Sequence, residues 1–118
     1  MNKKRVLIID DEPDIRELLA ITLSRMNIDT ELAENVTQAK SKLSKQTFNL
    51  CLTDLRLPDG SGLEVVEHIQ KQQPDLPVAV ITAHGSMDVA IEAMKAGAFD
   101  FLNKPIDLSV LRKLIESA

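Results

Sequence analysis

Five short apolar runs alternate with segments of helical periodicity, and this alternation constrains the fold more than any other feature of the chain. The runs predict strands at Val6–Ile9, Thr30–Ala33, Leu50–Thr53, Val78–Ile81 and Phe99–Leu102. The helical spacing predicts helices at Pro13–Leu23, Val36–Ser44, Leu63–Gln72, Met87–Lys95 and Leu108–Ser117. Because parallel strands need crossovers of a dozen or more residues, the alternation predicts an α/β fold with one five-stranded parallel sheet and helices on both faces.

The character of the segments agrees with this prediction. Strands buried on both faces read as continuous apolar runs, as Val78–Ile81 does. Pro13 suits the first turn of a helix, and residues 58–62 have the composition of a turn. The helix at Met87–Lys95 is rich in small residues, which bury little area each, so we expect it to be weakly anchored.

Composition excludes several classes of protein. The 14 basic and 18 acidic residues give a net charge of −4, and the basic residues are scattered, which argues against a nucleic-acid-binding surface. One cysteine permits no internal disulfide, and Cys51 on a predicted buried strand is expected to be inert. The apolar run before Asp10 is too short for a signal peptide or a membrane span, so a cytoplasmic location is expected.

Polar residues follow four of the predicted strands at the point where each strand ends. Asp10 and Asp11 follow the first strand, Asp54 the third, Thr82 the fourth and Lys104 the fifth. Ligand sites in open α/β sheets lie beyond the carboxyl ends of the strands. We therefore expect these carboxylates, the hydroxyl and the ammonium group at one edge of the sheet.

Crowded carboxylates must hold either a proton or a cation, since two unit charges ~4 Å apart repel by about 4 kcal/mol at an effective dielectric constant of about 20. Oxygen ligands without histidine or cysteine favour Mg²⁺, which is normally completed by a phosphate. Lys104 and Thr82 would then contact phosphate oxygens, and Asp54 is the candidate nucleophile. Taken singly, Asp11 could be a helix cap, Lys104 a solvated lysine and Thr82 a turn residue.

The sequence resembles the receiver domains of bacterial two-component response regulators over essentially its whole length. The resemblance is carried by Asp10-Asp11-Glu12-Pro13, Asp54 with Pro58 and Gly62, Thr82-Ala83, and Phe101 with Lys104-Pro105. The segment Gly85–Phe101 is similar to receivers of the NtrC-like class, which act at sigma-54 promoters. Within that class, Asp11–Met26 and Asn49–Gly62 resemble regulators of type IV pilus expression.

The resemblance implies a flavodoxin-like sheet of strand order 2-1-3-4-5. It also implies that Asp54 accepts a phosphoryl group from a sensor histidine kinase, with Thr82 and Lys104 contacting the phosphoryl oxygens. The implied Mg²⁺ ligands are Asp10, Asp11, Asp54 and the backbone carbonyl of Arg56. A cis peptide bond is expected before Pro105.

For signalling, the resemblance suggests that Thr82 and Phe101 form a switch. The expected output surface is made by the helix after Met87, the last strand and the last helix, and it would control homodimerisation. Residues 1–118 are expected to form a receiver domain excised from a longer transcription regulator, because the chain carries no phosphate-binding loop of an ATPase. Such a domain would be a phosphoacceptor that catalyses only its own phosphorylation and dephosphorylation, with no nucleic-acid or membrane contact of its own.

Two other functions remain open from sequence. A flavin-binding module would need a phosphate-cradling loop and stacking aromatics, whereas the first loop is acidic and the chain has no Trp or Tyr. A phosphatase with an aspartyl nucleophile would carry Asp-x-Asp after the first strand, where this chain has Asp-Asp-Glu. Arg56 and His84 are expected to border the pocket, either tuning phosphoryl lifetime or without a role, and His68 is expected to be a surface residue.

Overall fold

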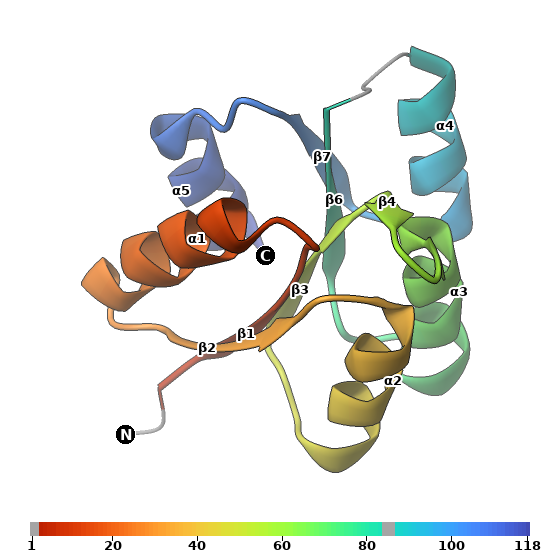
Figure 1. The fold of residues 1–118 in the computed structure, drawn as a ribbon, viewed down its shortest axis with the longest axis horizontal. Coiled ribbons are helices and arrows are strands. Elements are labelled where there is room, and N and C mark those ends of the chain that lie inside the picture. The colour runs from red at the N-terminus through yellow and green to blue at the C-terminus, as the bar shows by residue number, and fades with distance from the viewer. Residues whose placement is uncertain (1–2, 84–86) are drawn as a thin grey trace.

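The computed structural model describes residues 3–83 and 87–118, and its centre is a five-stranded parallel sheet (Figure 1). The strands, in their order across the sheet, are β2 (Asp29–Ala33), β1 (Arg5–Ile9), β3 (Leu50–Asp54), β6 (Val78–Thr82) and β7 (Asp100–Asn103). Since β6 and β7 are the fourth and fifth strands of this sheet along the chain, the predicted order 2-1-3-4-5 is confirmed. The last strand begins one residue later than predicted.

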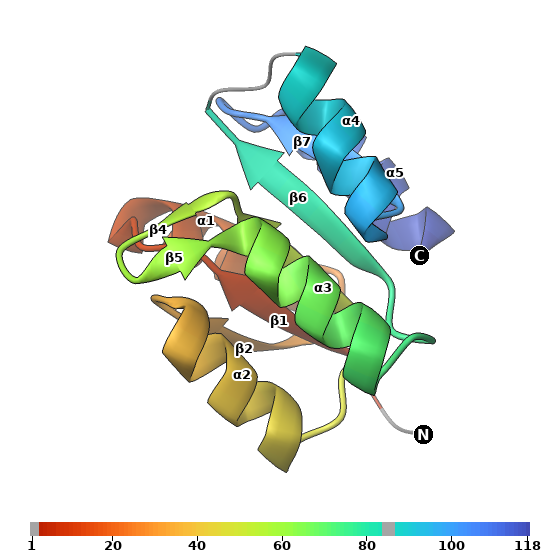
Figure 2. The same cartoon turned by 90° about the vertical axis from the view of Figure 1, so that its right-hand side faces the viewer.

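Within the described residues five helices cover the sheet, and each of them was predicted. They are α1 (Pro13–Arg25), α2 (Val36–Lys45), α3 (Gly62–Gln72), α4 (Met87–Ala96) and α5 (Leu108–Ser117). Helices α1 and α5 lie on one face, and α2, α3 and α4 on the other (Figures 1 and 2). The sheet therefore has a separate apolar core on each side.

Alternate residues of β1 pack into the two cores. Val6 and Ile8 pack with residues of α1 and α5, while Leu7 and Ile9 pack with residues of α2 and α3. Every residue of the central strands β3 and β6 is buried, whereas the edge strand β2 buries only Ala33. Burial on both faces is the reason that the central strands read as continuous apolar runs.

The register of the sheet aligns the carboxyl ends of its central strands. Ile9 of β1 pairs with Thr53 of β3, and Asp54 pairs with Ile81 of β6. Each of the three strands consequently ends one residue beyond its neighbour, in the order β1, β3, β6. The residues that follow β1, and those that end β3 and β6, lie on one rim of the sheet.

A short antiparallel hairpin, which sequence reasoning expected only as a turn, follows the central strand. It consists of β4 (Arg56–Leu57) and β5 (Gly60–Ser61), joined through Pro58 and Asp59. Two-residue strands are too short to produce an alternating pattern, so no periodicity could have predicted them.

Helix α4 differs from the others in what it buries. Its buried residues Ala90 and Ala93 are small, while the large side chains of Ile91 and Met94 are 44% and 43% exposed. Gly97, with a φ of 121°, follows its last residue, a backbone conformation that favours glycine. Among the helices in the described part of the chain, none combines the length and apolar character needed to cross a bilayer.

Candidate functional site

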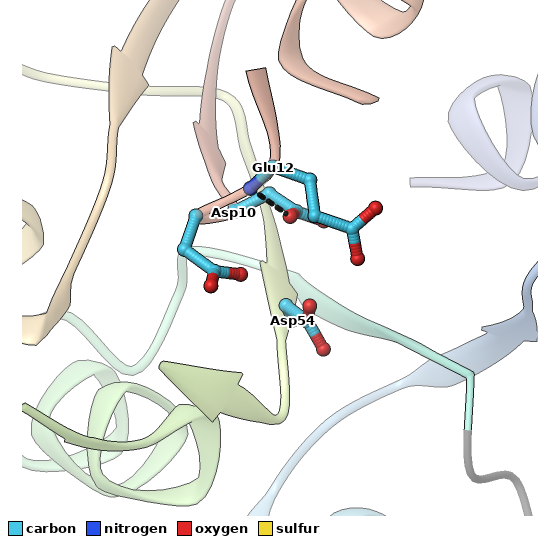
Figure 3. Close-up of side chains that lie close together, drawn as sticks. Asp10, Glu12 and Asp54 are labelled. Atoms are coloured by element: carbon cyan, nitrogen blue, oxygen red, sulfur yellow. Dashed lines mark hydrogen bonds between the residues drawn. The ribbon is translucent and has the colours of Figure 1, made fainter. Parts of the chain in front are cut away.

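Four carboxylates of the described residues meet at the rim where β1 and β3 end. They belong to Asp10, Asp11, Glu12 and Asp54, and one oxygen of each lies within 4.8 Å of the others. Figure 3 labels three of these residues, Asp10, Glu12 and Asp54. Asp10 and Asp54 are only 1% and 6% exposed, whereas Asp11 and Glu12 are exposed. The site therefore has a buried floor and an open, acidic mouth.

Local structure holds the first acidic loop in place. The Glu12 amide donates a hydrogen bond to Asp10 Oδ1 at 2.9 Å, drawn as a dashed line in Figure 3. Glu12 is the N-cap of α1, and Pro13 occupies the first helical turn, where its missing N–H costs nothing. The loop therefore turns sharply from β1 into α1 and directs the Asp10 carboxylate into the molecule.

Lys104 is the cation of the site and contacts three of the carboxylates. Its Nζ atom lies 2.9 Å from Asp10 Oδ2, 3.0 Å from Asp54 Oδ2 and 3.1 Å from Glu12 Oε1. The side chain is only 9% exposed. It reaches the site from the end of β7, where its backbone N–H donates to the Thr82 carbonyl at 2.9 Å and the Lys104–Pro105 bond is cis, as expected.

The site contains more acidic than basic groups. Burial raises the pKa of the Asp10 carboxyl above its ordinary value, although the bond from the Glu12 amide and the nearby Lys104 ammonium oppose this shift. For Lys104, burial works against the charged form, but the adjacent Asp10 and Asp54 carboxylates outweigh it and raise the pKa of the ammonium group. One ammonium group cannot neutralise four carboxylates.

The donor set fits a hard divalent cation. Among the described residues, Asp10 Oδ2 is buried without a well-aligned hydrogen bond, although it lies close to the Lys104 ammonium. The cluster offers carboxylate oxygens and neither histidine nor cysteine. Such a set suits Mg²⁺, which binds one or two carboxylates and keeps several waters.

The other predicted site residues surround this cluster. Arg56 is exposed at the start of the hairpin, and its N–H donates to Asp54 Oδ1 at 3.3 Å. Thr82 is buried at the end of β6 and lines a cavity of about 180 Å³ with Arg56 and with Val89 and Glu92 of α4. Phe101 pairs with Val80 within the sheet and is partly buried against the core on the α2–α4 side.

The structure thus brings Asp10, Asp11, Asp54 and Lys104 into one cluster, with Thr82 on the strand next to Asp54. Sequence reasoning gave Glu12 no role, yet its carboxylate belongs to the cluster and contacts Lys104. The sequence feature that could have indicated Glu12 is its position directly after the acidic pair Asp10-Asp11. His84 lies outside the described residues.

Cys51 and His68 lie apart from the acidic cluster. Cys51 is fully buried, and burial raises the pKa of its thiol, which favours the unreactive form. His68, on α3, is half-buried rather than fully exposed. Its burial and the nearby Lys40 charge lower the pKa of the imidazole.

Comparison with known proteins agrees with the fold and with the acidic rim. Residues 6–116 match the family model described as the response regulator receiver domain, and the chain belongs to this family. The matched family is that of receiver domains, rather than a family of flavin-binding modules or of phosphatases.

Proteins of similar sequence indicate which kind of response regulator the chain resembles. The chain is 60% identical over its full length to the response regulator protein PilR of Pseudomonas aeruginosa, of which it spans 26%. It is 36% identical over its full length to the DNA-binding transcriptional regulator NtrC of Proteus hauseri, of which it spans 25%. These relatives confirm the NtrC-like resemblance, and the chain spans about a quarter of their length.

Solved structures show the same fold. The beryllofluoride-activated NtrC4 receiver domain dimer matches with a TM-score of 0.91 and 34% identity, covering 96% of this chain and 93% of that one. A CheY-like receiver domain protein from Methanospirillum hungatei matches with a TM-score of 0.94 and 28% identity, covering 98% and 93%. The fold is therefore that of receiver domains, flavodoxin-like in its strand order.

Proposed function

We propose that residues 1–118 form a phosphoacceptor domain in which Asp54 receives a phosphoryl group from a histidine kinase. The observation that carries this proposal is the contact of the buried Asp54 carboxylate with Lys104 inside an acidic cluster. A buried nucleophile beside a fixed positive charge suits a transfer that depends on positioning and on charge neutralisation.

In the proposed transfer, an Asp54 carboxylate oxygen forms a bond to phosphorus while the bond from phosphorus to the histidine nitrogen of the kinase breaks. The electron pair of the broken bond stays on the imidazole, and the product is an acyl phosphate on Asp54. The Lys104 Nζ atom lies 3.0 Å from Asp54 Oδ2, and it would then contact the new phosphoryl oxygens.

Asp10, Asp11, Asp54 and the backbone carbonyl of Arg56 would hold Mg²⁺ in this proposal. Bound there, Mg²⁺ would neutralise charge on the phosphoryl oxygens. Glu12, at the open side of the cluster, adds negative charge that favours capture of the cation from solvent. The Arg56 N–H bond to Asp54 supports a role for this stretch of backbone, because it places residue 56 directly beside the phosphoacceptor.

The test is incubation with acetyl phosphate and Mg²⁺ followed by intact mass spectrometry. We expect the protein to gain one phosphoryl group and Asp54→Ala to gain none. Asp75→Ala, at an exposed aspartate before β6 at the opposite end of the sheet, is the matched control and should be phosphorylated like the parent. Phosphorylation of Asp54→Ala to the parent level would reject the proposal.

For signal output, we propose a switch in which the Thr82 hydroxyl moves toward the phosphoryl oxygens, Phe101 takes up the space released, and α4 shifts. The cavity beside Thr82 reaches residues of α4, and among the described side chains of this helix the buried ones are those of Ala90 and Ala93. In thermodynamic terms the phosphoryl group biases an equilibrium between two arrangements.

The output surface in this proposal lies on α4, β7 and α5. It exposes Ile91, Met94 and Val110, which are 44%, 43% and 46% exposed. The NtrC4 receiver domain is described as a dimer in its activated form, which supports homodimerisation as the output here. In a longer protein such a dimer would regulate ATPase and DNA-binding modules at sigma-54 promoters, in the cytoplasm.

Replacing Thr82 tests this route. Thr82→Ala should still accept a phosphoryl group but dimerise more weakly than the phosphorylated parent, because the hydroxyl that responds to the phosphoryl oxygens is gone. Sedimentation of both phosphorylated proteins measures the difference. Full dimerisation of phosphorylated Thr82→Ala would rule the route out.

A further inference from the structure

The segment that runs from the end of β2 into the first turn of α2 supplies no carboxylate to the cluster. It is nevertheless bonded to the β1–α1 loop, which supplies three of the carboxylates, and to the β4–β5 hairpin, which follows the strand that ends at Asp54. Its residues 34–37 lie next to the β1–α1 loop on one side and next to the β4–β5 hairpin on the other. Two side chains from outside this loop, Arg16 and Asp59, make the links. We call residues 34–37, which include Val36 and Thr37 of the first turn of α2, the bridging loop.

The first link runs through Arg16 of α1. Its Nη1 donates to the backbone carbonyl of Asp10 at 2.8 Å, and its Nη2 lies 3.3 Å from Glu34 Oε1. The guanidinium side chain is only 14% exposed. The Asp10 N–H also donates to the Ala33 carbonyl at 3.0 Å, so the acidic loop is tied to the end of β2 by backbone and by side chain.

The second link runs through Asp59, at the tip of the β4–β5 hairpin. Its Oδ1 accepts from the Val36 N–H at 2.8 Å, and its Oδ2 accepts from the Thr37 N–H at 3.0 Å and the Thr37 hydroxyl at 2.7 Å. These amides belong to the first turn of α2 and have no partner within the helix. A carboxylate from a distant segment therefore completes the cap of α2 and locates the hairpin against it.

The hairpin in turn is packed closely against the phosphoacceptor strand. Arg56 pairs with Ser61 across the hairpin and donates its N–H to Asp54 Oδ1. Gly62 follows directly, donating its N–H to the Leu55 carbonyl at 2.9 Å, and a Cβ atom there would collide with the Asp54 carbonyl oxygen. A displacement of the hairpin would therefore displace Arg56 relative to Asp54.

We infer that Arg16 and Asp59 are positioning residues that join the acidic loop and the hairpin through the bridging loop, and so fix the spacing at which these two segments bind a divalent cation. The two links, with β1 and β3, close a ring of contacts around the acidic site. Neither residue touches the reacting atoms. The inference rests on the proposed function, because it concerns the cation site used there.

The test compares the dissociation constant for Mg²⁺ in unphosphorylated variants, measured by NMR titration of backbone amides. Asp59→Ala removes the hairpin link, and Asp107→Ala is the matched control. Asp107 also caps a helix with one carboxylate, accepting from the Ser109 and Val110 amides and the Ser109 hydroxyl, but it caps its own helix α5.

We expect both variants to lower the thermal midpoint of unfolding, since each loses a cap. Of these two variants, only Asp59→Ala should raise the Kd for Mg²⁺, by about tenfold. This is the lower end of the loss in metal affinity that follows when a residue that orients metal ligands is removed. Arg16→Lys should raise it as well, because lysine lacks the planar fork that reaches two acceptors at once. Equal Mg²⁺ affinities of Asp59→Ala, Asp107→Ala and the parent would overturn the inference.

A second readout separates positioning from a general loss of structure. The rate of phosphorylation by acetyl phosphate, followed against Mg²⁺ concentration, should reach half its maximum at higher Mg²⁺ in Asp59→Ala and approach the parent rate at saturation. A lowered rate that saturating Mg²⁺ does not restore would contradict the inference. If Asp59→Ala does not fold, Thr37→Val, which loses only the hydroxyl link, carries the comparison with a smaller increase expected.

The two proposals fail in different ways. A parent protein that binds Mg²⁺ but takes no phosphoryl group would reject the proposed function, while the comparison of Kd values between Asp59→Ala and Asp107→Ala would still decide the inference. A parent that is phosphorylated normally, with unchanged Mg²⁺ affinity in Asp59→Ala and Arg16→Lys, would reject only the inference.

Discussion

At the scale of single residues, burial of the Asp10 carboxylate makes the stability of the folded protein depend on pH. Its carboxylate is almost completely buried, and burial raises its pKa against the opposing Glu12 amide and Lys104 ammonium. The folded protein therefore holds the Asp10 proton more tightly than the unfolded chain does. Ionisation of this group destabilises the fold as pH rises from the ordinary aspartate pKa of 3.8 through the higher folded value.

Asp10→Asn should consequently be more stable than the parent near neutral pH without Mg²⁺, because it removes a buried charge that one shared lysine only partly compensates. The advantage should shrink at acid pH, where the parent carboxyl is protonated. Urea unfolding at both pH values measures this, with Asp75→Asn as an exposed control. A metal-free Asp10→Asn protein less stable than the parent at neutral pH would show that the Lys104 contact outweighs the cost of burial.

At the scale of elements, the hairpin after β3 matters because its backbone approaches Asp54 closely. The space at Gly62 is filled by the backbone of Asp54 and Leu55, which cannot move independently of the central strand. At Gly60 the nearest atoms belong to the Glu64 carboxylate, 2.9 Å from an added Cβ, and this flexible side chain can turn away. Gly60 in the hairpin and Gly62 at the start of α3 should therefore respond differently to the same substitution.

Gly62→Ala should lower the free energy of unfolding by about 1–3 kcal/mol, the usual cost of forcing an extra carbon into a packed site. It should also slow phosphorylation by acetyl phosphate, since the Asp54 backbone must shift. Gly60→Ala should change both quantities little. Urea unfolding and intact mass spectrometry give the two measurements, and equal effects of the two alanines would show that the close approach to Asp54 has no consequence.

At the scale of the whole molecule, large apolar side chains are exposed on two separate sets of helices. Ile91, Met94 and Val110 lie on α4 and α5, and Leu18 and Ile21 lie on α1. The proposed output surface uses the first group only. The two groups can therefore be distinguished by the same kind of substitution on each.

Ile91→Lys should weaken dimerisation of the phosphorylated protein by about tenfold or more, because a lysine at the centre of an apolar contact must be desolvated. Leu18→Lys, with a comparably exposed leucine on α1, should dimerise like the parent. Both should take one phosphoryl group from acetyl phosphate. Sedimentation gives the dimer affinity, and a loss confined to Leu18→Lys would move the interface to α1.

The strands, the helices and the rim on which the polar residues fall all follow from the amino-acid sequence alone. Apolar runs and helical periods are local properties, and parallel strands place their carboxyl ends together, so Asp54 and Asp10 could be assigned to one edge before any coordinates. Tertiary structure alone decided which atoms meet: that Glu12 joins the cluster, that Lys104 serves three carboxylates, and that Asp59 caps a helix that begins 23 residues before it. These contacts depend on register, loop path and side-chain direction, which the packing of distant elements sets and which leave no period in the sequence.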